Sequence, residues 1–108
     1  MTNETVFYLV DPGERPPFGR VADELWGPQA NVDSDGNSRT PDDTQWTELS
    51  LILRDGSDET YIHIDSVTTF PLVLQIRSFD AGLAERAAGL LGKETKGSIK
   101  LGMPGPLS

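Results

Sequence analysis

Apolar and polar residues alternate most clearly in the middle of the chain. Three stretches, 46–54, 59–67 and 72–77, place every second residue on one apolar face, which is typical of half-buried β-strands. Turn-forming residues connect the first stretch to the second at 55–58 and the second to the third at 68–71. The apolar positions are Leu49, Leu51, Leu53, Ile62, Ile64, Leu72, Leu74 and Ile76. This pattern predicts an antiparallel β-meander.

The segment after the meander has helical spacing instead. Ser78 or Asp80 is suited to cap a helix over residues 80–92, and Gly92 followed by Lys93 marks its end. The apolar stripe of this helix is Leu83, Ala84, Ala87, Ala88, Leu90 and Leu91. We therefore expect one main helix that packs through this stripe on the apolar face of the meander.

The remaining segments carry weaker signals. Residues 5–10 are rich in β-branched and aromatic side chains and stop at a turn signal, so they predict an edge or short opening strand. We expect one or two helical turns in 21–26, a long polar loop in 27–45 and a short final strand in 97–101. The whole chain, 1–108, then forms a single α+β domain: an antiparallel sheet with one main C-terminal helix packed on one face.

Charge is unevenly distributed along this chain. The sequence has 17 acidic and 9 basic residues, a formal net charge of -8 at pH 7. Residues 1–65 hold 14 of the acids and 4 arginines, whereas residues 66–108 hold 3 acids and 5 basic residues. Nucleic acid is thus a poor partner, because phosphate backbones are bound by clusters of Lys and Arg. The acidic half either serves solubility alone or forms an electrostatic docking face for a basic protein.

The scarcity of some residue types narrows the chemistry further. The sequence has no Cys and a single His, so it offers neither a disulfide nor a thiolate metal site. Its first residues lack the basic segment of a signal peptide, and no apolar stretch approaches the roughly 20 residues that a membrane helix needs. We expect a cytoplasmic protein with no cofactor and no membrane partner.

One residue pair raises the possibility of catalysis. His63 and Asp65 lie two residues apart on a predicted strand and so project from the same face, an arrangement that can orient an imidazole. A nucleophile or further metal ligands at a recognisable spacing are missing, so polar side chains on a solvent-facing strand are the favoured interpretation. We predict that the chain is not an enzyme.

A partial calcium-loop pattern begins at Asn31. Oxygen-bearing side chains occupy its first, third and fifth places, Asn31, Asp33 and Asp35, and Gly36 occupies the sixth. The twelfth place holds Asp42 where the pattern usually has Glu, and no amphipathic helix precedes the segment. The segment is interpreted either as a plain turn cluster or, as the alternative function, as a calcium-binding or structural module.

The region 46–101 carries a family resemblance. It contains Leu-Ser-Leu-Ile-Leu-Arg, Tyr-Ile-His-Ile-Asp and Pro-Leu-Val-Leu-Gln-Ile-Arg-Ser, followed by an Ala-rich helix that ends Leu-Leu-Gly-Lys. In size, acidity and meander-then-helix order it resembles bacterial immunity proteins, the small inhibitors that protect a cell from its own polymorphic or contact-delivered toxins. The resemblance implies stoichiometric inhibition, in which an acidic surface occludes the active site of a cognate toxin whose surface is basic.

The predicted contacts with such a partner lie in two loops and beside them. Binding residues tend to sit in loops, and the segments 27–45 and 55–59 hold much of the acidic excess. Two Trp residues bracket the first segment, where an exposed Trp would be an interface anchor and a buried one part of the core. The predicted partner-binding residues are Asp33, Asp35, Asp42, Asp43, Trp46, Asp55, Asp58 and Glu59.

Overall fold

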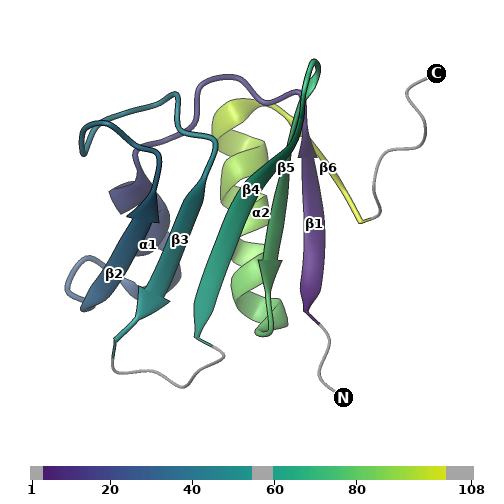
Figure 1. Ribbon diagram of the computed structural model, residues 1–108. Coiled ribbons are helices and arrows are strands. Elements are labelled where there is room, and N and C mark those ends of the chain that lie inside the picture. Colours follow the sequence, from purple (N-terminus) through teal and green to yellow (C-terminus); the bar gives the residue numbers. More distant parts are fainter. Residues whose placement is uncertain (1–3, 55–59, 102–108) are drawn as a thin grey trace.

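Six strands pair into one open antiparallel sheet in the part of the chain that the computed structural model describes, residues 4–54 and 60–101, and two helices lie on one side of it (Figure 1). From edge to edge, the strand order is β2-β3-β4-β5-β1-β6. The elements are β1 (Thr5–Val10), α1 (Phe18–Trp26), β2 (Val32–Gly36), β3 (Leu49–Leu53), β4 (Tyr61–Thr69), β5 (Leu72–Ser78), α2 (Ala81–Thr95) and β6 (Ser98–Lys100). The predicted α+β fold is confirmed.

The predicted meander forms the middle of the sheet. Strand β3 pairs with β4 and β4 with β5, so that Leu51 lies opposite Ile62 and Ile64 opposite Ile76. Paired residues on neighbouring strands point to the same face, and these four side chains are 0% exposed. The alternation in the sequence therefore identified the buried face of these strands correctly.

Helix α2 covers that buried face. The Asp80 side chain caps it by accepting a hydrogen bond from the Leu83 N–H at 3.2 Å, as one of the two predicted caps. The helix continues past the predicted end at Gly92 to Thr95. Gly92 serves close packing instead, because a Cβ at this position would lie 3.1 Å from the Ile99 side chain of β6.

Helix α1 is longer than the one or two turns expected at 21–26. It begins at Phe18, directly after Pro17, whose fixed backbone suits a helix start. Val21 and Leu25 are buried in the same core as α2, and Arg86 of α2 donates a hydrogen bond to the Leu25 carbonyl at 3.0 Å. In the described residues, no helix is long and apolar enough to cross a membrane.

Strand β1 is an interior strand, so the expectation of an edge strand was wrong. It pairs with β5 on one side and with the short strand β6 on the other. The final strand predicted at 97–101 is confirmed, and it is this strand that covers the edge of β1. A pattern of residues within 5–10 cannot reveal such a neighbour, because the pairing depends on a segment about 90 residues away in the sequence.

The expected loop 27–45 contains a strand. Strand β2 pairs with β3, and the pairing extends at both ends, where Arg54 N–H donates to the Asn31 carbonyl at 3.0 Å and Asn37 N–H to the Glu48 carbonyl at 3.1 Å. The sequence Val-Asp-Ser-Asp-Gly is unfavourable for a strand by propensity. Backbone pairing with an apolar neighbour strand outweighs that preference here.

Candidate functional site

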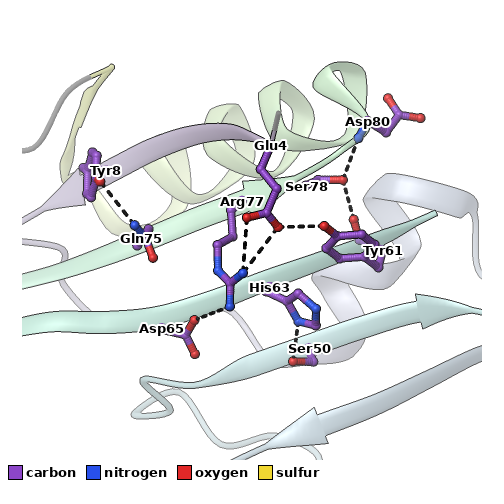
Figure 2. Close-up of polar contacts among 10 residues, drawn as sticks. All are labelled: Glu4, Tyr8, Ser50, Tyr61, His63, Asp65, Gln75, Arg77, Ser78 and Asp80. Carbon is purple, nitrogen blue, oxygen red and sulfur yellow. Dashed lines mark hydrogen bonds and ion pairs between the residues drawn. The ribbon is translucent and has the colours of Figure 1, made fainter. Parts of the chain in front are cut away.

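The helices leave the other side of the sheet uncovered, and we call this side the open face (Figures 1 and 2). Registers place its residues in rows across the strands, since paired residues share a face. One row runs from Asp35 through Ser50 and His63 to Arg77. The polar and aromatic residues of the open face include Tyr8, Asp33, Asp35, Ser50, Tyr61, His63, Asp65, Gln75, Arg77 and Lys100, and its apolar residues include Val6, Val10, Ile52 and Val73. It is a mainly polar surface spanning all six strands.

A charged network stands at the centre of the open face (Figure 2). Glu4, which directly precedes β1, accepts a hydrogen bond from the Tyr61 hydroxyl at 2.6 Å and pairs with the Arg77 guanidinium at 3.3 Å. Arg77 also pairs with Asp65 at 3.3 Å. The Tyr61 hydrogen bond is the main cause that lowers the Glu4 pKa, and burial followed by the Glu4 carboxylate raises the pKa of Tyr61 to about 12.

His63 borders this network and is held on two sides. Its Nδ1 lies 2.7 Å from Ser50 Oγ, and its ring centroid lies 4.6 Å from that of Tyr61 (Figure 2). Burial, and then the nearby charge of Arg77, lowers the His63 pKa below the usual 6.5, which favours the neutral imidazole. His63 and Asp65 share a face as predicted, but Asp65 is paired with Arg77 instead of orienting the imidazole.

The acidic residues that lie near β2 form a second feature, which we call the acidic edge: Asp33, Asp35, Asp42 and Asp43. Asp33 pairs with Arg54, whose Nε lies 2.8 Å from its Oδ1. Asp35 and Asp42 have no ion-pair partner among the described residues. The edge therefore presents carboxylates whose charge the neighbouring side chains do not neutralise.

The loop 37–47 that follows β2 is fixed by its own polar side chains. Asn37 Oδ1 accepts hydrogen bonds from the N–H groups of Thr47 and Glu48 at 2.9 and 3.0 Å. Asp43 accepts from the N–H groups of Arg39 and Gln45 at 2.8 and 2.7 Å, and these bonds lower its pKa. Asp43 thus shapes the loop, whereas Asp42 is bonded only to the Thr40 hydroxyl, at 2.6 Å, among the contacts within this loop.

Trp46 was predicted at the partner surface, and this prediction was wrong. Its side chain is 1% exposed, and Nε1 donates a hydrogen bond to the Pro16 carbonyl at 2.7 Å. The Trp46 carbonyl in turn accepts from Arg15 Nε at 2.8 Å. Trp46 therefore lies inside the protein, where it joins the loop 37–47 to the segment before α1.

Three further predicted partner-binding residues, Asp55, Asp58 and Glu59, lie outside the described residues. For calcium, the segment from Asn31 contains the extended strand β2 in place of a continuous loop, so Asp33 and Asp35 are spaced along a strand and do not curl around one ion. Within residues 4–54 and 60–101, no three His, Cys, Asp or Glu side chains gather closely enough to hold a metal ion.

Two hollows adjoin the acidic edge. The first, of about 190 Å³, is lined by Phe18, Ser34, Asp35, Gly36 and Ser38. The second, of about 590 Å³, is lined by Asn37, Arg39, Thr40, Asp43 and Gln45. Ser50 and His63 line neither of these two hollows, so their hydroxyl–imidazole contact does not lie in either one.

Sequence reasoning missed several residues that shape this surface. Glu4, Tyr61 and Arg77 form the central network, yet they come from three separate strands or strand ends and carry no local motif. A signal did exist, because Tyr61 and Arg77 both lie on the non-apolar face of the predicted strands. Phe70, at the turn between β4 and β5, is 97% exposed and was also missed.

Comparison with known proteins does not assign this surface to a family. No family model, curated protein or solved structure matches the chain.

Proposed function

We propose that this protein is a stoichiometric inhibitor, an immunity protein that binds a cognate toxin and covers its basic active site. The observation that carries the proposal is the open face bordered by the acidic edge. Asp33, Asp35 and Asp42 are exposed at that border, and only Asp33 has an ion-pair partner among the described residues. A surface with unneutralised carboxylates beside an uncovered sheet face is suited to a basic protein partner.

Electrostatics explains how such a surface would work. A partner whose active site is rich in Lys and Arg, as in enzymes that act on phosphates, is drawn to an acidic surface from a distance, which raises the association rate. Contact then releases the water held by both surfaces, and the residence time depends on the packing at the interface. In this proposal the inhibitor itself performs no catalysis, acts in the cytoplasm, and binds neither nucleic acid nor membrane.

The polar network at the centre of the open face supports binding over turnover. Arg77 pairs with both Glu4 and Asp65. Ser50 Oγ contacts the His63 nitrogen, and the His63 ring is inclined at 44° to the Tyr61 ring. Groups that are satisfied in this way give a preformed surface, which reduces the cost of ordering side chains on binding.

The test of this proposal is whether the protein binds and neutralises a candidate toxin. An immunity gene ordinarily follows its toxin gene directly, so the product of the gene immediately upstream is the candidate partner. We expect a one-to-one complex by mass measurement, and protection of cells that express the candidate toxin when this protein is coexpressed. Protection should be lost when Asp33, Asp35 and Asp42 are replaced by Asn. A toxic product that neither binds nor is neutralised would contradict the proposal.

A further inference from the structure

Strand β2 has a free edge. It is the outermost strand of the sheet, and β3 is its only strand neighbour within the described residues (Figure 1). In an antiparallel pair, every second residue bonds its N–H and C=O to the neighbouring strand, and the residues between point theirs away from it. The bond from the Arg54 N–H to the Asn31 carbonyl fixes this alternation. Residues 31, 33, 35 and 37 therefore bond to β3, and residues 32, 34 and 36 direct their backbone groups to the free edge.

This edge offers unpaired backbone groups to another strand. Val32 and Ser34 each direct an N–H and a C=O outward, and Ser34 lies in a run of exposed residues. The Gly36 N–H is the exception, because it donates to Asp35 Oδ1 at 2.9 Å. A row of unpaired N–H and C=O groups is a template for strand addition, in which main-chain hydrogen bonds hold an extended segment of a partner.

The two faces of an added strand would meet different surroundings. Asp33 and Asp35 point to the open face, so every second side chain of the added strand would lie beside these carboxylates. Ser34 lies opposite the buried Leu51 and so points to the helix side. There the hollow of about 190 Å³ lies between Phe18 and β2, and the other side chains of the added strand would lie beside it.

Charge selects the occupant of this edge. A second copy of β2 would bring Asp33 and Asp35 beside their own counterparts, and like charges on paired strands are destabilising. Asp35 has no ion-pair partner in the described part of the chain, and Asp33, although paired with Arg54, keeps a side chain that is 55% exposed. A strand with Lys or Arg at every second position would meet opposite charges instead.

We infer that the free edge of β2 receives a β-strand of the basic partner, whose basic side chains lie on the open face and whose alternating apolar side chains lie against the hollow beside Phe18. This inference rests on the proposed function, because it specifies how the partner of the acidic edge is held. Main-chain pairing gives the complex a register, which attraction between charges alone does not supply.

A peptide titration tests the edge without any toxin. The probe is a capped Val-Lys-Val-Lys-Val peptide added to the isotope-labelled protein, and a Val-Lys-Lys-Val-Val peptide of the same composition and charge is the control without alternation. NMR follows the shifts and the hydrogen exchange of the backbone amides. We expect saturable shifts and slower exchange at Val32 and Ser34 with the alternating peptide only, because their N–H groups gain acceptors.

Substitutions at Ser34 isolate the contribution of the backbone. Ser34→Pro removes the outward N–H, and proline is tolerated on an edge strand where that group faces solvent. Ser34→Ala removes the same hydroxyl but keeps the N–H, so it is the matched control. We expect the Pro variant to lose saturable binding and the Ala variant to retain it, with both melting close to wild type. With the upstream gene product, the Pro variant should bind roughly tenfold more weakly than the Ala variant.

Other outcomes would overturn the inference. Shifts on the open face with unchanged exchange at Val32 and Ser34 would mean surface attraction without strand pairing, and this readout on the wild-type protein decides even if Ser34→Pro unfolds. Equal binding of both peptides would refute the alternating pattern, and dimerisation that Ser34→Pro abolishes would make a second copy the occupant. These results concern the edge alone. Absence of any complex with the upstream gene product would instead count against the proposed function.

Discussion

The middle of the sheet and its acidic edge use the same antiparallel pairing but different side chains. On β3, β4 and β5, Leu51, Ile62 and Leu74 are 0% exposed and lie beneath the helices. On β2, the residues from Asp33 to Gly36 are all exposed, and the strand is held by backbone hydrogen bonds, the Asn37 side chain and the Asp33–Arg54 pair. The centre therefore supplies most of the apolar burial, and the edge carries exposed charges, of which Asp35 and Asp42 have no ion-pair partner among the described residues.

The largest expected effect is the loss of stability when a buried leucine in the middle of the sheet is truncated. Leu51→Ala or Leu74→Ala should lower the free energy of unfolding by roughly 2–5 kcal/mol, because each leaves a cavity in a core that is fully packed. Ile52→Ala, on the same strand but 44% exposed, is the matched control and should cost less. Denaturant unfolding measures both; equal losses would refute the assignment of the buried face.

The next prediction concerns Gly36 on β2, where the backbone of Glu48 leaves no room for a side chain. Gly36 has φ of +151°, and a Cβ there would collide with the Glu48 carbonyl of the neighbouring chain segment. We expect Gly36→Ala to destabilise the protein by about 2–3 kcal/mol. Gly19→Ala in α1 is the control, since a Cβ there has nothing within 4 Å, and it should be neutral or stabilising. A harmless Gly36→Ala would contradict the tight contact of β2 with β3.

Tyr61→Phe tests whether the central network contributes to stability. The change removes the 2.6 Å hydrogen bond to Glu4 and should cost about 1–2 kcal/mol near neutral pH. The lowered Glu4 pKa stabilises the fold above 4.5, and this contribution is lost as the pH falls through the lower folded value. Thermal melting from neutral to acid pH should therefore bring the variant and wild type closer together. A constant difference would show that Glu4 is not the relevant partner.

A smaller effect is expected at His63. Its folded pKa lies below 6.5, so the unfolded chain binds a proton that the folded chain resists, and stability falls as the pH drops from 6.5 towards the folded pKa. His63→Gln should show a shallower decrease over that range. Unfolding free energies measured from pH 6.5 downwards provide the comparison, and parallel curves for the two proteins would contradict the lowered pKa.

Predictions from the sequence were correct for the middle of the sheet and less successful for its β2 edge. Leu51, Ile64 and Ile76 alternate with polar residues, and that periodicity encodes both the strand and its buried face. Strand β2 was predicted as a loop because Asp33 and Asp35 disfavour strands, while the backbone pairing that overrides them depends on β3. Trp46 could not be placed, because a Trp beside acids is equally compatible with a surface anchor and with the observed burial against Pro16.

The candidate site was predictable only in part. Asp33, Asp35 and Asp42 are exposed, and their role in binding a partner stays a prediction. The Glu4–Tyr61–Arg77 network joins residues up to 73 positions apart, so its assembly requires the strand order. The hollow beside Asp35 likewise depends on α1 lying next to β2, which no local pattern encodes.

The central claim is that the acidic edge, and not net charge alone, attracts the partner. The decisive measurement is the association rate with the upstream gene product at low and high salt for three proteins: wild type, an edge variant and a helix variant. The edge variant is Asp33→Asn, Asp35→Asn and Asp42→Asn; Asp43 is kept because it shapes the loop. The helix variant is Asp23→Asn, Glu85→Gln and Glu94→Gln, three exposed acids on α1 and α2.

Both variants change the net charge by the same amount. We predict that the edge variant associates roughly tenfold more slowly at low salt, with a weaker dependence on salt, while the helix variant stays close to wild type. Stability of the edge variant should change by less than about 1 kcal/mol, since exposed charges contribute little to folding. Equal slowing by both variants, or no slowing by the edge variant, would contradict the account.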